Sequence, residues 1–177
     1  MTEDTDGPVP PKHSLTVILG IPGSGKSTYS KSLVPTEYLN TVRINLDDLR
    51  LMFGVRFKEE LEEDIWWLTI IMADHLLATK RNVVIDESIT NPEYMKRLKA
   101  LASRHGVALN GVWVDSPSYL CWKKREGTDF PREAFERKFA EWELHRKAIL
   151  CLCDNVEVVD GNRELLERMC LTVTTGA

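Results

Sequence analysis

The sequence has little that would suit a membrane protein or a strongly basic protein. Its 177 residues contain no apolar run of the length that crosses a bilayer, so no association with a membrane is expected. The 23 Lys and Arg residues are outnumbered by 27 Asp and Glu residues, which gives a net charge of −4. A protein that coats nucleic acid with its whole surface is therefore excluded, and any such contact must come from local basic patches.

Cysteine is scarce, and its spacing does not suit a metal site. The four cysteines lack the paired spacing of metal ligands, so we expect buried or free thiols at Cys121, Cys151, Cys153 and Cys170. No signal peptide is expected before the first strand, and no internal repeat is visible. These features favour a reducing, cytoplasmic location.

The sequence does contain a regular alternation of strands and helices. The first 13 residues are acidic and proline-rich, and we expect a disordered tail there, followed by one domain over residues 14–177. Apolar runs predict strands at 14–20, 41–45, 82–86, 109–115 and 155–161. Helices are predicted at 26–34, 58–81, 92–106, 116–127 and 131–150, and one after residue 161. This order predicts an α/β fold with a parallel five-stranded sheet, helices on both faces and ligands at the carboxyl ends of the strands.

The most specific motif joins the first strand to the first helix. Gly20, Gly25, Lys26 and Ser27 fill the pattern G-x-x-x-x-G-K-S. Glycines let the backbone wrap around phosphates with its N–H groups inward, the lysine neutralises the outer phosphates, and the serine can ligate Mg²⁺. The motif therefore predicts binding of ATP, or of another nucleoside triphosphate, together with Mg²⁺.

The stretch "INLDDLR" places two carboxylates after the second strand. We expect this strand to neighbour the phosphate-loop strand, so Asp47 or Asp48 could accept a proton from an attacking hydroxyl. Either aspartate could instead simply cap the helix that follows. Arg50 could hold an anionic group of the acceptor, or it could be a solvated surface residue.

Two later stretches complete the candidate site. Asp86 ends the third strand in an arrangement like the Walker B motif, as a direct or indirect ligand of Mg²⁺, and Glu87 after it could polarise water in an ATPase. The segment "CWKKREGTDFPREAFERK" concentrates Lys123, Lys124, Arg125 and Arg132 after the fourth strand. It could close over the phosphates and stabilise charge in the transition state, or it could be an exposed helix end with basic residues.

Four segments in one order resemble a known family. "GIPGSGKST", "RINLDDLR", "VVIDESITNPEYMKRLKALASRHG" and "VWVDSPSYLCWKKREGTDFPREAFERKFAEWE" are arranged as in the polynucleotide 5′-hydroxyl kinases of the phage type. The wider group of small P-loop kinases, which includes the zeta toxins, has a similar plan. The resemblance covers residues 14–145 and implies a P-loop kinase fold with a short basic lid.

The resemblance also implies roles for individual residues. Donor phosphates would be bound by Gly20, Gly23, Ser24, Gly25, Lys26, Ser27, Thr28, Arg125 and Arg132, and Mg²⁺ by Ser27 and Asp86. Asp47 matches the general base, Arg50 matches an arginine that grips an acceptor phosphate, and Arg125 is similar to a catalytic lid arginine that acts with Lys26. The family's Asp-x-Thr-Asn run is Asp86-Glu87-Ser88-Ile89 here. Ser88 keeps a hydroxyl for the acceptor, but Ile89 cannot replace the hydrogen bonds of an asparagine.

The expected activity is therefore phosphoryl transfer from ATP to a hydroxyl of a nucleic acid, first of all the 5′-hydroxyl of a polynucleotide, and of DNA before RNA. Kinases of this plan could instead phosphorylate a hydroxymethylated base in DNA or a small-molecule hydroxyl. A further alternative is a nucleoside triphosphatase or nucleotide-binding module in which Glu87 activates water. A toxin-like kinase also remains open. The sequence predicts neither the acceptor itself nor the oligomeric state.

Overall fold

The computed structural model describes residues 13–34, 40–55 and 58–161. Five strands lie in these residues: β1 (Leu15–Leu19), β2 (Thr41–Asn45), β3 (Asn82–Asp86), β4 (Leu109–Asp115) and β5 (Asn155–Asp160). Six helices accompany them: α1 (Lys26–Ser32), α2 (Leu46–Met52), α3 (Glu59–Ala78), α4 (Pro92–Arg104), α5 (Ser118–Arg125) and α6 (Arg132–Cys151). The predicted tail, apart from His13, and the helix predicted after residue 161 lie outside the described residues. The assignment of one domain to residues 14–177 stays a prediction.

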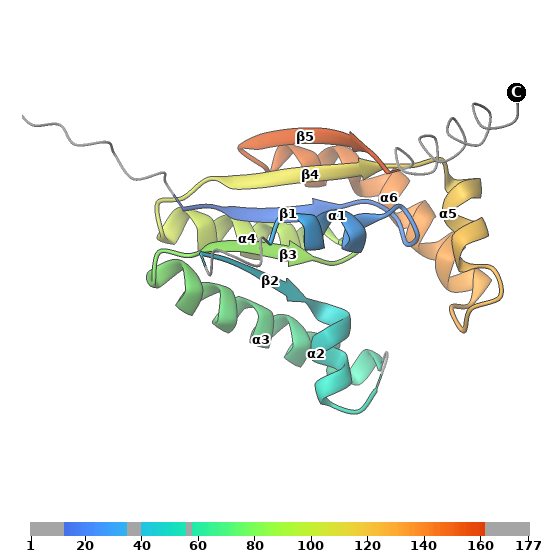
Figure 1. Ribbon diagram of the computed structural model, residues 1–177, viewed down its shortest axis with the longest axis horizontal. Helices are drawn as coiled ribbons and strands as arrows, with labels where there is room; N and C mark the ends of the chain where they lie inside the picture. Colours follow the sequence, from blue (N-terminus) through green and yellow to red (C-terminus); the bar gives the residue numbers. More distant parts are fainter. Residues whose placement is uncertain (1–12, 35–39, 56–57, 162–177) are drawn as a thin grey trace, which may run out of the picture.

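The five strands form one parallel sheet in the order β2-β3-β1-β4-β5, which confirms the predicted α/β class (Figure 1). The expectation that the second strand neighbours the phosphate-loop strand is wrong, because β3 lies between β1 and β2. Residues Val83 to Asp86 of β3 are buried, whereas the first three residues of β2 are only partly buried. A continuous apolar run suits the interior of a parallel sheet, and a half-polar strand suits its edge.

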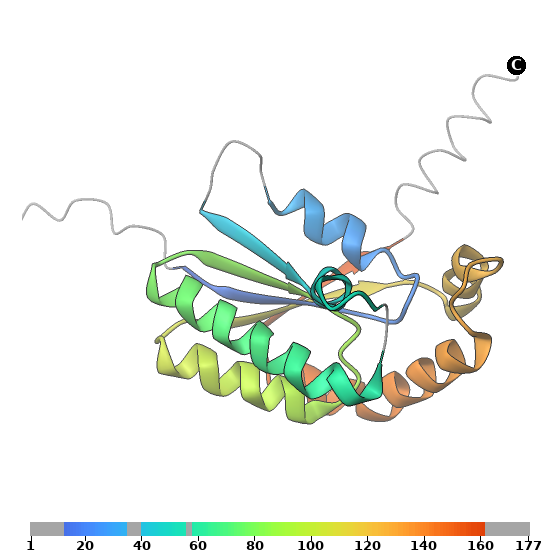
Figure 2. The ribbon, with the colours of Figure 1, turned by 90° about the horizontal axis from the view of Figure 1, so that it is seen from below.

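The helices form a layer on each face of the sheet. Helix α1 covers one face, and α3, α4 and α6 lie side by side on the other (Figure 2). Successive strand residues point to opposite faces, so neighbouring side chains belong to different cores. Val17 packs in the large cluster under α3, α4 and α6, whereas Ile18 packs with Val84, Val112 and Val114 under α1. None of the helices in the described part of the chain is long and apolar enough to span a bilayer.

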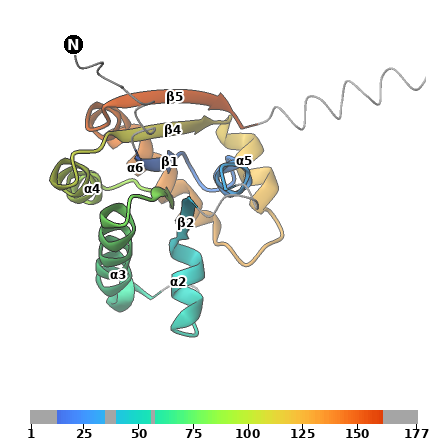
Figure 3. The ribbon, with the colours of Figure 1, turned by 60° about the vertical axis from the view of Figure 1, so that its left-hand side comes forward.

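The chemistry-bearing segments gather beyond the carboxyl ends of the strands. The phosphate loop follows β1, α2 follows β2 on one side of it, and α5 follows β4 on the other (Figures 1 and 3). In an open parallel sheet this is the edge where ligands bind. The fold therefore brings the phosphate loop, the "INLDDLR" stretch and the basic segment to one place.

Candidate active site

The backbone of the phosphate loop requires glycine. Gly20, Gly23 and Gly25 have φ angles of +138°, +83° and +105°, a region that residues with a Cβ atom rarely adopt. At Gly23 an added Cβ would also lie 2.4 Å from the carbonyl oxygen of Cys121 in α5. The loop is thus held directly against the basic segment, which fits the predicted cradle and lid.

Two buried polar side chains of the loop, Lys26 and Ser24, are suited to bind phosphates. The Lys26 ammonium donates to the carbonyl oxygen of Ile21 at 2.8 Å, and its side chain is 7% exposed. Burial lowers the pKa of Lys26 to about 8, although the carboxylates of Glu87 and Asp86 partly offset the effect. The hydroxyl of Ser24 is fully buried and has no hydrogen-bond partner among the described residues. A wrapped backbone, a buried ammonium and an orphan hydroxyl fit the phosphates of a nucleotide.

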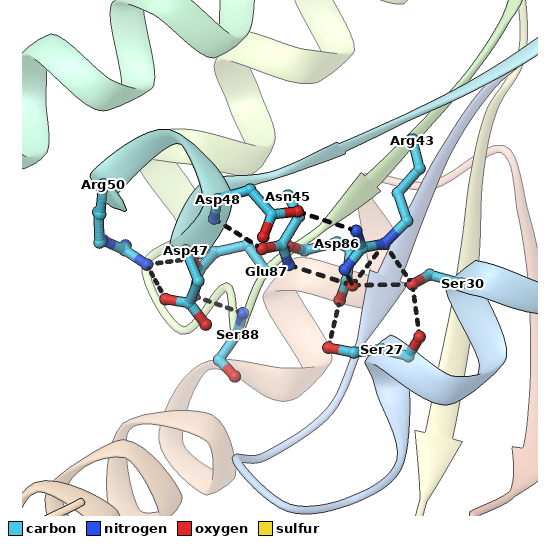
Figure 4. Close-up of polar contacts among 10 residues, drawn as sticks. All are labelled: Ser27, Ser30, Arg43, Asn45, Asp47, Asp48, Arg50, Asp86, Glu87 and Ser88. Atoms are coloured by element: carbon cyan, nitrogen blue, oxygen red, sulfur yellow. Dashed lines mark hydrogen bonds and ion pairs between the residues drawn. The ribbon is translucent and has the colours of Figure 1, made fainter. Parts of the chain in front are cut away.

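Ser27 and Asp86 face one another at the predicted Mg²⁺ site (Figure 4). The Ser27 hydroxyl lies 3.4 Å from Asp86 Oδ1. The other oxygen, Asp86 Oδ2, accepts hydrogen bonds from Ser30 (2.7 Å), Asn45 (3.2 Å) and Arg43 (2.5 Å from Nη2). With its carboxylate held on one side, Asp86 suits an indirect ligand that orients water around the ion. No group of three His, Cys, Asp or Glu side chains that could hold a metal by itself occurs in the described residues.

Arg43 is a site residue that the sequence analysis missed. It comes from β2, and its guanidinium also donates to Ser30 at 2.8 Å and to Asp48 at 3.2 Å. Arg43 therefore connects Asp86, at the predicted Mg²⁺ site, with Asp48. An arginine inside a strand of a parallel sheet is the signal that could have indicated such a partner, because a buried charge is rarely left unpaired.

Arg50 holds a second group of carboxylates. The guanidinium donates to Asp47 Oδ1 at 2.6 Å, to Glu87 Oε2 at 2.9 Å, and to both oxygens of Glu62 at 2.8 Å each (Figure 4 shows all of these except Glu62). The side chain of Arg50 is only 8% exposed, so the interpretation as a solvated surface residue is wrong. The four contacts raise the pKa of Arg50 despite burial, so the arginine is always charged. Glu62 was not predicted.

The two adjacent aspartates belong to different groups. Asp47 pairs with Arg50 and Asp48 pairs with Arg43. Neither caps α2, because the side chain of Asn45 accepts from the backbone N–H of Asp48 at 2.9 Å. The capping alternative for Asp47 and Asp48 is therefore wrong. A carboxylate at Asp47 is not needed to start the helix, and it is 75% exposed.

The loop after β3 has little freedom. The backbone N–H of Ser88 donates to Glu87 Oε1 at 2.7 Å, so both oxygens of Glu87 accept hydrogen bonds. Ile89 is buried in the core, and Thr90 donates to Glu141 of α6 at 2.6 Å. The side chain of Ile89 thus anchors the loop by packing in the core. Ser88 lies beside Arg50, Asp47 and Glu87 (Figure 4), which together with Glu62 form the Arg50 group.

Two arginines of the basic segment, Arg125 and Arg132, have different partners. Arg125 lies over the ring of Phe130 at 5.3 Å, and its charge contributes to the lowered pKa of Lys26. Arg132 instead pairs with Glu136 at 2.8 Å and lies over the ring of Trp122 at 5.5 Å. The charge of Arg125 thus acts on Lys26, whereas the contacts of Arg132 are with Glu136 and the ring of Trp122. Thr28 is exposed on α1, where it follows Ser27.

Sequence comparison identifies the family of this chain. Residues 15–148, well over half of the chain, match the model of the AAA domain family. The chain belongs to the AAA domain family. No curated protein matches this AAA domain protein in sequence.

Solved structures place the AAA domain protein among small P-loop kinases in fold. A chain of the Pnkp1/Rnl/Hen1 RNA repair complex is 26% identical with a TM-score of 0.66, and the match covers 77% of this chain and 46% of that chain. Shikimate kinase from Acinetobacter baumannii, solved with shikimate, is 14% identical with a TM-score of 0.58, covering 92% and 94%. The APS kinase CysC of Mycobacterium tuberculosis, solved with AMPPNP and APS, is 16% identical with a TM-score of 0.56, covering 92% and 99%.

These likenesses confirm the predicted P-loop kinase fold. The AAA domain protein spans just under half the length of the RNA repair chain that it matches. The resemblance to small P-loop kinases is therefore supported, whereas membership of the phage-type polynucleotide kinases stays a prediction.

Proposed function

We propose that this AAA domain protein transfers the γ-phosphate of ATP to a hydroxyl group of a nucleic acid, first of all the 5′-hydroxyl of a polynucleotide. The observation that carries the proposal is the 2.6 Å pair of Asp47 and Arg50 at the same sheet edge as the phosphate loop. A phosphate cradle alone suits any nucleoside triphosphatase. An exposed carboxylate, held in place beside the cradle, suits removal of a proton from an acceptor hydroxyl.

The proposed step balances with the residues at hand. The proton of the acceptor hydroxyl passes to the Asp47 carboxylate, and the acceptor oxygen forms a bond to the γ-phosphorus. The bond between that phosphorus and the β–γ bridging oxygen breaks, and ADP leaves. Lys26 and the loop N–H groups neutralise the donor phosphates, and Arg125 stabilises charge that develops on the transferred group. Ser27 and Asp86 would hold Mg²⁺, which would supply positive charge that stabilises the negative charge of the donor phosphates.

The hydrolase alternative receives less support from the geometry. A glutamate that activates water must aim a carboxylate oxygen at the water. Here Glu87 Oε1 accepts from Ser88 and Oε2 accepts from Arg50. Glu87 is therefore part of the group that Arg50 holds, whereas Asp47 has an exposed carboxylate.

A second acceptor class is favoured by one observation. Arg50, the residue that resembles an acceptor-phosphate grip, is already paired with three carboxylates. A hydroxymethylated base in DNA, or a small-molecule hydroxyl, would not require that grip. The RNA repair likeness supports a polynucleotide end, and the Arg50 group supports these alternatives.

The proposal is tested with a panel of acceptors and ATP labelled in its γ-phosphate. The panel contains 5′-hydroxyl DNA, 5′-hydroxyl RNA, DNA with hydroxymethyluracil, and free nucleosides, beside a reaction without acceptor. We expect label on at least one acceptor, and loss of that label when EDTA removes Mg²⁺. Release of inorganic phosphate at one rate in every tube, with no labelled acceptor, would contradict the proposal.

A further inference from the structure

Arg43 places a fixed positive charge at the predicted Mg²⁺ site. Strand β2 pairs with β3 so that Asn45 lies opposite Asp86, and alternation along the strand puts Arg43 on the same face as Asn45. This is the face that α1 covers, because Val84, two residues before Asp86, packs in the cluster under α1. The guanidinium of Arg43 therefore reaches Asp86 and Ser30 beside the start of α1 (Figure 4).

One oxygen of Asp86 accepts most of the hydrogen bonds at this place. Asp86 Oδ2 accepts from Arg43 Nη2 at 2.5 Å and from Arg43 Nε at 3.0 Å. Ser30 and Asn45 also donate to Oδ2, whereas Oδ1 has the Ser27 hydroxyl at 3.4 Å. The ion pair is shielded from water, since the side chain of Asp86 is 1% exposed and that of Arg43 is 15% exposed. Arg43 thus fixes the carboxylate with Oδ1 toward Ser27.

This ion pair changes what a divalent cation meets before a nucleotide binds. The negative charge of Asp86 is already matched by the positive charge of Arg43. Asp48, the other carboxylate that Arg43 contacts, is 69% exposed, so water screens its charge. Arg43 repels a divalent cation twice as strongly as a monovalent one at the same distance. Ser27 and Asp86 therefore attract Mg²⁺ weakly until the phosphates of a nucleotide add negative charge.

We propose that Arg43 is a positioning residue and the resident counter-ion of the Mg²⁺ site. It orients Asp86 for the ion, and it keeps the ion from binding until the donor phosphates are present. Mg²⁺ therefore enters together with the nucleotide. The inference goes beyond the proposed transfer, because it concerns the metal and the donor and holds for any acceptor. If Arg43 merely stabilised the fold, its loss would lower the stability and leave the affinity for the metal unchanged.

The test measures binding of Mn²⁺ to the nucleotide-free protein by electron paramagnetic resonance, because Mn²⁺ favours the same oxygen ligands as Mg²⁺. Arg43→Gln should bind Mn²⁺ more tightly than wild-type protein by about tenfold or more, since the repelling charge is gone. Arg43→Lys keeps the charge and should bind as weakly as the wild type. Arg104→Gln is the matched control, because it removes an arginine that is paired with Asp74, and it should also bind as weakly as the wild type.

Asp86→Asn in the Arg43→Gln background shows whether the gained site is the proposed one. The double variant has neither charge of the pair, so it leaves no unpaired carboxylate in the interior and should fold. It should lose the gain in Mn²⁺ affinity, and a gain that persists would overturn the inference. If Arg43→Gln by itself does not fold, wild type is compared with Asp86→Asn. The two should bind Mn²⁺ equally weakly, and binding by the wild type that Asp86→Asn removes would overturn the inference.

Binding of AMPPNP, measured by calorimetry, gives the complementary result. Wild-type protein should bind AMPPNP about tenfold or more tightly in Mg²⁺ than in EDTA, because the ion couples the phosphates to Ser27 and Asp86. Equal affinities would mean that these residues hold no metal, which would overturn the inference. Equal Mn²⁺ affinities of nucleotide-free wild type and folded Arg43→Gln would overturn it as well. Neither measurement involves an acceptor, so its outcome is independent of whether the proposed transfer to a nucleic acid is observed.

Discussion

Replacing Asp47 by asparagine separates the role of its charge from its role in the fold. Asn45, and not Asp47, caps α2, so the helix keeps its first hydrogen bond. The Asp47 side chain is 75% exposed, so water screens its pair with the buried Arg50, and the pair is worth about 0–1 kcal/mol. Without it, Arg50 keeps Glu62 and Glu87 as partners. A charge in the first helical turn adds about 0.3–1 kcal/mol. For a chain of this size, 1 kcal/mol lowers the Tm by about 2–4 °C, so Asp47→Asn should unfold only a few degrees below the wild type.

The effect on phosphoryl transfer should be far larger than the effect on stability. Asparagine keeps the shape of aspartate but cannot take up a proton from the acceptor hydroxyl. Loss of a general base lowers the rate by roughly 10²-fold or more, which corresponds to about 3 kcal/mol in the barrier. The affinity for ATP should be unchanged, because the hydrogen bond and ion pair of Asp47 are with Arg50 of the same helix.

The assay measures transfer to the best acceptor of the panel, with thermal unfolding and ATP binding measured on the same samples. Asp48→Asn is the matched control, because Asp48 is similarly exposed (69% against 75%) but pairs with Arg43 instead of Arg50. We expect a much milder loss of transfer in the control. Normal transfer by Asp47→Asn, or equal losses in the two variants, would refute the assignment of Asp47 as the base.

Three further predictions concern the cradle and the basic segment. Burial lowers the pKa of Lys26 to about 8, and bound phosphates raise it again, so ATP binding should take up a proton and weaken as the pH rises above about 8. Calorimetry in buffers of different ionisation enthalpy measures this proton uptake. The control Lys26→Met should show no proton uptake and no phosphoryl transfer. Arg125→Ala should lower kcat by ~10³-fold with little change in ATP affinity. Arg132→Ala loses the contacts to Glu136 and Trp122 and should leave kcat within twofold. Equal effects of the two changes would contradict the different roles assigned to these arginines. Gly23→Ala should destabilise the protein by at least about 1–2 kcal/mol in thermal or urea unfolding, because the φ of +83° and the carbonyl of Cys121 leave no room for a methyl group. An unchanged unfolding midpoint would mean that the loop does not pack on α5.

The sequence was sufficient to predict the strands, the phosphate loop and the bounds of every described helix except α2, because these features have local signals. The glycines and the lysine of the phosphate loop lie within residues 20–26, and an apolar run marks each strand. The order of strands was harder to predict, because the run "TVRIN" does not by itself show that β3 will separate it from β1.

The charged groups around the candidate base could not be predicted for a different reason. Arg43 and Asp86 are 43 positions apart, and their pairing depends on the register of β2 against β3. Glu62 lies in the run "KEELEED", in which several acidic residues have the same local pattern, and only the packing of α3 beside α2 brings this one to Arg50. Three neighbouring residues of "INLDD" are good caps, so the choice of Asn45 also required the structure.

The most direct test of the central claim follows the γ-phosphate of ATP in a single reaction. Purified protein is given ATP, Mg²⁺ and the full set of hydroxyl acceptors, and the label is divided between acceptor and inorganic phosphate. Wild-type protein should place most of the label on an acceptor, Asp47→Asn should lose that product, and Glu87→Gln should still form it. Label found only as inorganic phosphate, at a rate that depends on Glu87 and not on Asp47, would contradict the account.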